Sequence, residues 1–399
     1  MGLAAPAAHF VPRADAFDHA SIQPSLSWSG KISLCFQPQS SSTKWAAEAA
    51  APLNPPISSP AQAFGINRAN LAPISHSQAA SARVRLLPVT ESQQPLSAHP
   101  ASLRARLAAF AADIKIAHTV FALPWALLAT FLAANANGNR FPRLPILALI
   151  LLCMITARTV AMAMNRLLDA SLDAMNPRTR GRAIPSGQLS RPFVIALTAL
   201  TAAAFVAITV GFCWLDGNRL PLLLSIPVLA FLSAYPLLKR FTRLCHYYLG
   251  VALALAPLCA WIAVTGTVDL PPLLMAGAVV LWTAGFDILY ACQDFDNDRR
   301  TGIFSIPAKV GIPAALFLAR LTHAASWVFM LLLWRTTPQF GVLFLVAVSL
   351  AGLLLIIENA LVRPTDLSRL GFAFFVINGG ISILIGIMGI ADILLHRAL

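Results

Sequence analysis

Two sets of polar side chains have the types and spacing of a metal-binding site. The first is Asn165, Asp169 and Asp173, and the second is Asp294 with Asp298. A step of four residues advances an α-helix by about 400°, so the members of each set are expected to share one helix face. Carboxylates placed four residues apart repel one another. A bound cation would compensate that charge.

The cation that these side chains favour is Mg²⁺. Magnesium prefers oxygen ligands, keeps several waters, and is commonly held by one or two carboxylates together with substrate phosphates. Neither set includes a His or Cys ligand, which disfavours Zn²⁺. Basic residues that would suit a diphosphate beside the metal are Arg178, Arg180, Arg182, Lys239 and Arg240. Membrane topology alone explains more than half of these basic residues.

Another polar residue lies seven positions before each set, Arg158 before Asn165 and Asp287 before Asp294. This shared spacing indicates an internal repeat, in which two corresponding helices present polar faces to a common cavity. An ionisable side chain at membrane depth costs several kcal/mol unless it is paired or hydrated. Arg158 and Asp287 therefore either form a structural ion pair or take part in function.

The elements that must position these groups are membrane-spanning helices. Of the 399 residues, 58% are hydrophobic and 11% are charged, whereas a soluble domain carries roughly 25% charged residues. A bilayer is the solvent that suits such a chain. From about residue 117, apolar segments recur that are long enough to cross roughly 30 Å of hydrocarbon. The sequence predicts nine spans, at 117–135, 144–166, 192–212, 219–238, 246–265, 271–292, 311–333, 339–361 and 370–395.

The positive charges give these spans an orientation. Connections after the even-numbered spans hold thirteen Lys and Arg residues, against five on the opposite side. The N-terminus, the even-numbered loops and both acidic sets are therefore predicted to face the cytoplasm. The net charge of +13 follows from these loops, and no basic helix or stripe suggests a nucleic-acid partner.

The six cysteines form no CxxC pair, and their positions indicate small core residues and not a metal site or disulfides.

Residues 1–105 differ from the rest of the chain. They are rich in Ala, Ser, Pro and Gln, and residues 50–60 alone hold four prolines, which excludes a helix there. The composition predicts disorder, while an organellar presequence or a misplaced start codon stays open. The chain thus divides into an N-terminal extension, 1–105, and an all-α membrane domain, 106–399.

Over essentially all of residues 110–395, the chain resembles the UbiA superfamily of intramembrane prenyltransferases. The resemblance rests on NRxxDxxxD at 165–173, NPRT at 176–179, IPSG at 184–187, YPLLKR at 235–240, DILYACQDxxxD at 287–298 and GIFSIP at 302–307. It implies nine helices around a central cavity that opens laterally to the lipid. It also implies Mg²⁺-dependent transfer of a polyprenyl chain from its diphosphate to an aromatic acceptor.

The resemblance further implies roles for single residues near the diphosphate. The residues that would bind Mg²⁺ and, through it, the diphosphate, and so form the catalytic centre, are Asn165, Asp169, Asp173, Asp294 and Asp298. Lys115, Lys239 and Arg240 would contact the diphosphate or the cytoplasmic mouth of the cavity. Arg178 is also predicted to bind the substrate.

On the acceptor side, the resemblance implies that Arg158 faces the acceptor's carboxylate. Asp287 is another substrate-binding candidate, and the base that removes the ring proton would be Asp287 or Asp296. Segments 157–159 and 290–294 are most similar to the 4-hydroxybenzoate polyprenyltransferases of ubiquinone or menaquinone synthesis. The branch that serves the futalosine route to menaquinone, with a dihydroxynaphthoate as acceptor, is an alternative. Homogentisate, a chlorophyllide and protohaem also stay open.

A cation-coupled transporter is the alternative from another class, with the acidic sets forming a cation site at the repeat interface. Against it, the carboxylates lie at the ends of spans, whereas transport sites usually lie near the midplane. The expected location is a bacterial inner membrane, or else the mitochondrial inner membrane. The lipid bilayer is the expected surrounding, and no obligate protein partner is evident.

Overall fold

The computed structural model describes residues 102–114 and 116–396. The disorder expected for residues 1–101 and the role expected for Lys115 lie outside the described residues. A short helix, α1 (Leu103–Asp113), opens the described part, and the Ser102 side chain caps it by accepting a hydrogen bond from the Ala105 amide. The helical part therefore begins slightly before the boundary predicted at residue 105.

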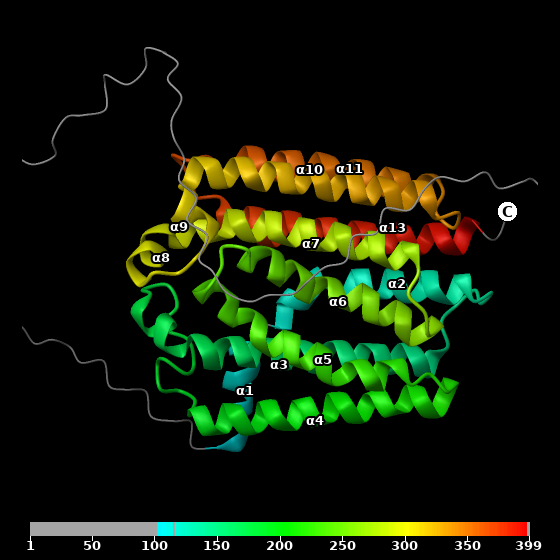
Figure 1. Ribbon diagram of the computed structural model, residues 1–399, viewed down its shortest axis with the longest axis horizontal. Coiled ribbons are helices and arrows are strands. Elements are labelled where there is room, and N and C mark those ends of the chain that lie inside the picture. Colours follow the sequence, from blue (N-terminus) through cyan, green and yellow to red (C-terminus); the bar gives the residue numbers. More distant parts are fainter. Residues whose placement is uncertain (1–101, 115, 397–399) are drawn as a thin grey trace, which may run out of the picture. The chain divides into compact units, whose positions relative to one another are not determined.

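Within the described residues, nine helices are long and apolar enough to cross a membrane. They confirm the all-α prediction, and no strand longer than an isolated bridge is present in that part of the chain. Figure 1 shows the long helices running side by side. Their α-helical parts are α2 (Leu123–Ala136), α3 (Leu144–Met175), α4 (Arg191–Asp216), α5 (Leu220–Ala234), α6 (Cys245–Thr265), α7 (Leu270–Ala291), α10 (Ile312–Thr336), α11 (Val342–Leu361) and α13 (Asn378–His396).

The third helix continues well past the predicted end of its apolar span at residue 166. It runs without a break to Met175, so Asn165, Asp169 and Asp173 lie on regular α-helix, as their spacing requires. Hydropathy marks where the chain leaves the hydrocarbon, not where the helix ends. The polar last turns of α3 remain helical because neighbouring basic side chains bind them, as described below.

The corresponding region after α7 is built differently. A 3₁₀ turn, Cys292–Asp294, follows α7, and a short helix, α8 (Phe295–Thr301), starts after it. The α-helical stripe predicted from Asp287 to Asp298 is therefore interrupted. Equal spacing in the two halves does not produce equal helix faces, and the repeat expected from it is only approximate.

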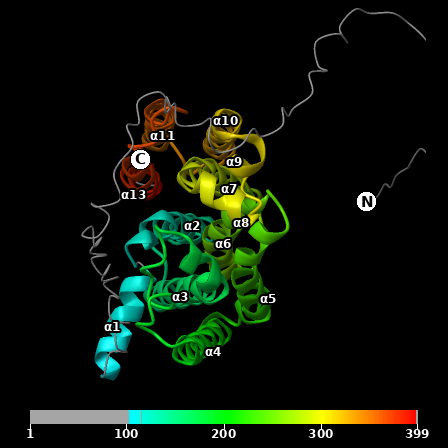
Figure 2. The ribbon, with the colours of Figure 1, turned by 90° about the vertical axis from the view of Figure 1, so that its left-hand side faces the viewer.

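Close helix packing rests on small residues, as is usual in membranes. At Gly250 on α6, an added Cβ would lie 2.3 Å from the carbonyl oxygen of Val280 on α7. Helix α2 packs against both α6 and α13, and Figure 2 shows it between the two groups of helices. Trp125 and Trp282 are fully buried where these helices meet. The core thus joins the two halves of the membrane domain.

Candidate active site

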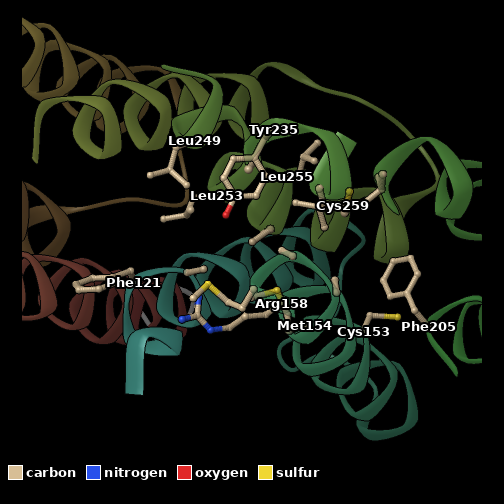
Figure 3. Close-up of a pocket in the computed structure, with 18 of the residues that line it drawn as sticks. Phe121, Cys153, Met154, Arg158, Phe205, Tyr235, Leu249, Leu253, Leu255 and Cys259 are labelled. Carbon is tan, nitrogen blue, oxygen red and sulfur yellow. The ribbon is translucent and has the colours of Figure 1, made fainter. Parts of the chain in front are cut away.

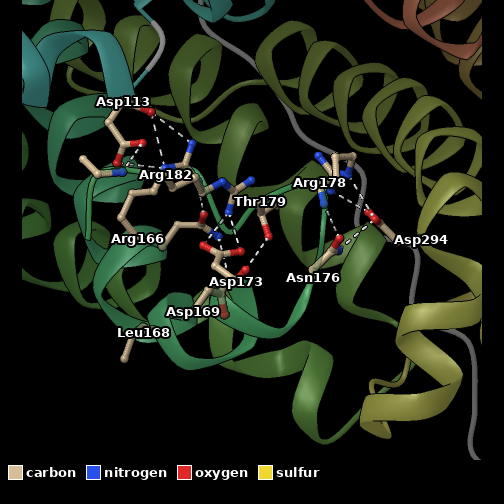
Figure 4. A network of polar contacts seen from close by, with 12 residues as sticks. Asp113, Arg166, Leu168, Asp169, Asp173, Asn176, Arg178, Thr179, Arg182 and Asp294 are labelled. Atoms are coloured by element: carbon tan, nitrogen blue, oxygen red, sulfur yellow. Dashed lines mark hydrogen bonds and ion pairs between the residues drawn. The ribbon is translucent and has the colours of Figure 1, made fainter. Parts of the chain in front are cut away.

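The two acidic sets meet at one end of the helix bundle. The loop that follows α3 carries Asn176 and Arg178, and both side chains reach Asp294, which lies 118 residues beyond Asn176 (Figure 4). The Asn176 amide donates to Asp294 at 3.0 Å. The Arg178 guanidinium donates to both carboxylate oxygens, at 3.0 and 2.6 Å. The prediction that both sets share one side is thereby confirmed, while the membrane face on which they lie stays a prediction.

Burial and hydrogen bonding act in opposite directions on Arg178. Burial lowers its pKa, but the hydrogen bonds and negative charge of Asp294 outweigh that effect and raise the pKa above the usual value. The guanidinium therefore stays charged, as recognition of an anionic substrate requires.

Asp169 is the most enclosed member of the first set, with 1% of its surface exposed. Its Oδ2 accepts from Lys239 Nζ at 2.6 Å and from the Asn165 amide at 3.1 Å. Arg240 donates to the carbonyl of Leu168 and lies 3.9 Å from Asp169 Oδ1. The structure therefore brings Asn165, Asp169, Lys239 and Arg240 together, and their binding of a diphosphate stays a prediction.

Asp173 is held by an arginine from the loop after α3. Arg182 Nη1 donates to both carboxylate oxygens of Asp173 at 2.7 Å, and the Thr179 hydroxyl donates to the Asp173 carbonyl at 3.1 Å. From the sequence, Arg182 was expected only as one of the basic residues that suit a diphosphate. Its position in the chain does not show which carboxylate the loop will bring it to.

The buried Arg166 ties α1 to this end of the bundle and was not predicted as a site residue. Its guanidinium donates to the carbonyl of Asp113 at 3.1 and 3.3 Å, and to Asn165 at 2.8 Å. Asp113 in turn accepts from the Ala183 amide at 3.3 Å. Arg166 directly follows Asn165 in the NRxxDxxxD motif, and this position in the motif could have identified it from the sequence.

The second acidic set contacts a different partner from the one considered in the sequence. Asp287 Oδ2 lies 2.7 Å from Nδ1 of His246, so the partner that the structure shows for Asp287 is this ring, which the sequence did not predict. Asp298 is buried, and its backbone carbonyl accepts from the Ile303 amide at 2.9 Å. Asp296 is exposed on α8. His246 was missed because a single histidine in an apolar segment has no spacing pattern.

A cavity of about 340 Å³ opens beside these groups, between α3, α4, α5, α6 and α7 (Figure 3). Three of the predicted site residues line it, namely Arg158, Asn165 and Arg178. Figure 3 shows the Tyr235 hydroxyl and the Arg158 side chain on opposite walls. The polar end of the cavity is thus continuous with the acidic and basic cluster.

The remainder of the cavity is apolar. Its wall on α3 extends from Asn165 back to Ile150, a distance of about 22 Å at 1.5 Å per helical residue. Phe205 and Phe212 of α4 and Cys259 of α6 line the distant part. This shape suits an amphiphile with an anionic head and a long hydrocarbon tail.

The residues of the polar end also fit a magnesium ion. Among residues 102–114 and 116–396, no three His, Cys, Asp or Glu side chains gather into a metal-holding group, and the motif carboxylates are bound by Lys239, Arg182 and Arg178. Asp169 Oδ1 is nevertheless buried without a hydrogen-bond partner. An orphaned carboxylate oxygen in a set made only of oxygen donors suits Mg²⁺.

The fold and this cavity define a multi-pass membrane protein whose cavity is polar at one end of the bundle and apolar over the rest of its length. A model of the UbiA prenyltransferase family matches residues 122–379. The chain therefore belongs to the UbiA prenyltransferase family.

Curated relatives carry two kinds of name. A protoheme IX farnesyltransferase of Bradyrhizobium diazoefficiens is 34% identical over 181 residues, which are 45% of this chain and 55% of that protein. A 4-hydroxybenzoate octaprenyltransferase of Nitrosomonas europaea is 31% identical over 239 residues, 57% of this chain and 76% of that protein. Several relatives are matched over little more than half of their own length, including one from Neisseria meningitidis at 57%.

Solved structures share the fold. An apo UbiA homolog from Aeropyrum pernix K1 matches with a TM-score of 0.59 and 29% identity, over 71% of this chain and 99% of that one. A UbiA homolog from Archaeoglobus fulgidus bound to GPP and Mg²⁺ matches with a TM-score of 0.55, over 71% and 99%. At 17% identity, this second match shows the fold alone.

Proposed function

We propose that this protein transfers a polyprenyl group from its diphosphate to an aromatic acid within the membrane, using Mg²⁺. The observation that carries the proposal is the position of Arg178. Its side chain lines the apolar cavity and also binds Asp294 of the second acidic set. A substrate with its tail in the cavity would therefore have its diphosphate beside both acidic sets.

The polar end supplies binding groups for the metal and the diphosphate. Magnesium would be held by oxygen ligands from Asn165, Asp169, Asp173, Asp294 and Asp298, and when bound it supplies the charge that stabilises the leaving diphosphate. Arg178 and Arg182 line the cavity, and their guanidinium groups suit bidentate binding of phosphate oxygens. Lys239 and Arg240 add positive charge behind Asp169.

The reaction is a substitution at the allylic carbon. The C–O bond breaks, and its electron pair leaves with the diphosphate. A ring carbon of the acceptor, ortho to the phenol, forms the new C–C bond and then loses its proton to a base. The apolar wall keeps water away from the allylic cation, and the cavity holds both partners in contact.

Asp287 is the better candidate for that base. It lies on α7 between two cavity-lining residues, Phe286 and Tyr290, and it is partly buried. Asp296 is exposed on α8. Asp287 follows the cavity-lining Phe286 directly, so it lies nearer to a bound acceptor than Asp296, which would need a longer relay to reach the ring proton.

The acceptor that we favour is 4-hydroxybenzoate. Arg158 lines the cavity away from the acidic sets, where its guanidinium would pair with a carboxylate on the acceptor. Relatives named 4-hydroxybenzoate octaprenyltransferase support this choice. A dihydroxynaphthoate carries the same carboxylate, and the relative named protoheme IX farnesyltransferase makes haem a further candidate.

Acceptor competition in membranes that contain the expressed protein tests the proposal. The reaction would contain Mg²⁺, a long-chain polyprenyl diphosphate, and equal amounts of 4-hydroxybenzoate, a dihydroxynaphthoate and haem, with products identified by mass. Prenylated 4-hydroxybenzoate is the expected product. A different prenylated acceptor would correct the acceptor alone, and no prenylated product would remove the activity and revive a cation transporter.

A further inference from the structure

His246 uses both nitrogens of its ring, and the mechanism above assigns it no part. It is the second residue of α6 and is 3% exposed. Nδ1 lies 2.7 Å from Asp287 Oδ2. Nε2 accepts a hydrogen bond from the backbone N–H of Ile306 at 3.1 Å. The ring therefore joins α6, α7 and the segment that follows α8.

These two contacts fix the tautomer of the ring. A backbone N–H can only donate, so Nε2 must present its lone pair to Ile306. The proton then resides on Nδ1, and the Nδ1–H donates to the Asp287 carboxylate. A hydrogen bond of this kind sets the orientation of the carboxylate without changing its charge.

The second contact reaches the metal set through a short helix, α9 (Ile306–Val310). Ile306 is its first residue, and Ser305 caps it by accepting from the Ala308 amide at 3.4 Å. In the segment just before this helix, the Ile303 amide donates to the backbone carbonyl of the buried Asp298 at 2.9 Å. The anchor on Ile306 therefore lies three residues from the amide that binds Asp298.

The same segment also contacts the basic end of the site. The Phe304 amide donates to the Lys239 carbonyl at 2.8 Å, and the Lys239 side chain binds Asp169 of the first set. Movement of residues 303–306 would consequently displace Asp298 and relax the connection to Lys239.

We infer that His246 is a positioning residue with two separable tasks: Nδ1–H orients Asp287, next to the cavity-lining Phe286, and Nε2 anchors Ile306 and so holds Asp298 in the metal set. The kinetic effect expected for each task rests on the proposed function. The two contacts themselves are independent of which reaction takes place.

Two substitutions separate the tasks because each copies one ring nitrogen. In His246→Asn, the shorter amide reaches the place of Nδ1 and can donate to Asp287, but nothing accepts from Ile306. In His246→Gln, the longer side chain places its amide oxygen near Nε2 and can accept from Ile306, but the donor to Asp287 is lost. Tyr247→Phe is the matched control, since Tyr247 is the neighbouring residue and its hydroxyl bonds Thr322 on α10.

Steady-state kinetics should divide the two variants. Changes to groups that orient metal ligands typically cost about 10- to 100-fold in metal affinity or activity. We expect His246→Asn to raise the Mg²⁺ concentration for half-maximal rate and the KM for the prenyl diphosphate by about tenfold, with kcat little changed. We expect His246→Gln to lower kcat by about tenfold, with both of those concentrations unchanged. Tyr247→Phe should match the wild type.

Amide hydrogen exchange in detergent gives a readout that does not require activity. Faster exchange confined to segment 303–307 is expected in His246→Asn and not in His246→Gln. The same exchange pattern in both variants, or the same kinetic change in both, would overturn the inference and reduce His246 to a packing residue. If the wild type makes no prenylated product, the proposed function fails, and the exchange experiment still decides whether His246 anchors Ile306.

Discussion

At the scale of single residues, the polar end of the cavity is a set of charges already compensated by one another. Asp169 binds Lys239, Asp173 binds Arg182 and Asp294 binds Arg178. The basic side chains of these pairs are 23–38% exposed, while their carboxylates are largely buried, and charges taken out of water are costly unless the geometry of the pair is good. On the proposed function, a metal and a diphosphate would exchange into the same contacts.

Replacement of one carboxylate from each acidic set tests this explanation. Asp169→Ala and Asp294→Ala should each lower turnover by more than about 100-fold, because a metal ligand and the partner of a basic residue are lost together. Both proteins should still insert and elute as folded protein from size exclusion in detergent. Near-normal turnover of either variant would contradict the assignment of the acidic sets to the metal.

Conservative replacement of Arg178 separates charge from geometry. Arg178→Lys keeps the positive charge but loses the fork that binds both oxygens of Asp294. We expect the KM for the prenyl diphosphate to rise by about tenfold, which corresponds to about 1.4 kcal/mol. Arg180→Lys, on the exposed side of the same loop, is the control. An unchanged KM in Arg178→Lys would remove Arg178 from diphosphate binding.

Only some of these residues and contacts could be predicted from the sequence. Helical spacing placed Asp169 and Asp173 correctly, because period 3.6 holds wherever the helix is regular. The His246 partner of Asp287 was not predicted, because the pairing depends on how α6 packs against α7, and spacing along one helix carries no such information. Arg182 meets Asp173 through a loop whose backbone course cannot be deduced from composition.

At the scale of elements, hydropathy predicted the nine spans because the thickness of the hydrocarbon fixes their length. Most helix limits agree with the predicted spans to within a few residues. The exceptions are the polar continuation of α3 and the 3₁₀ turn after α7. Both lie where the chain leaves the hydrocarbon, so hydrogen bonds to neighbouring loops, and not transfer free energy, determine the backbone.

The contact between α6 and α7 gives a prediction about stability. In Gly250→Ala, the new methyl group would meet the Val280 carbonyl, which is backbone and cannot move aside alone. We expect a loss of about 1–3 kcal/mol, seen as a lower midpoint of thermal unfolding in detergent. Gly380→Ala on α13, where nothing lies within 4 Å of the added Cβ, should keep the wild-type midpoint. Equal midpoints for both variants would mean that the helices separate easily.

At the scale of the whole molecule, the distribution of positive charge predicts which end faces the cytoplasm. A cysteine introduced by Arg180→Cys, at the end with the acidic sets, should react with a membrane-impermeant maleimide only after cells are opened. A cysteine introduced by Arg335→Cys, at the end of α10, should react in intact cells. Both positions are exposed. The reverse pattern would invert the predicted orientation.

The cavity itself belongs to this scale, since five helices contribute its wall and no single segment encodes its shape. Along α6, Ala256 lies ten residues from His246, which is about 15 Å into the membrane from the polar end. Ala256→Phe would place a ring in the path of a long hydrocarbon tail while leaving the diphosphate site intact. We expect a ten-carbon prenyl diphosphate to react at nearly the wild-type rate and a forty-carbon donor to lose about tenfold or more.

The comparison of the two donors in Ala256→Phe is informative because misfolding would lower both rates together. Ala230→Phe, at an exposed position of α5, adds the same volume outside the cavity and should leave the ratio of the two rates unchanged. A ratio unaffected by Ala256→Phe would mean that the tail leaves the cavity before it reaches this depth. The prenyl chain would then extend into lipid from near Arg158, and the distant part of the cavity would have to serve another ligand.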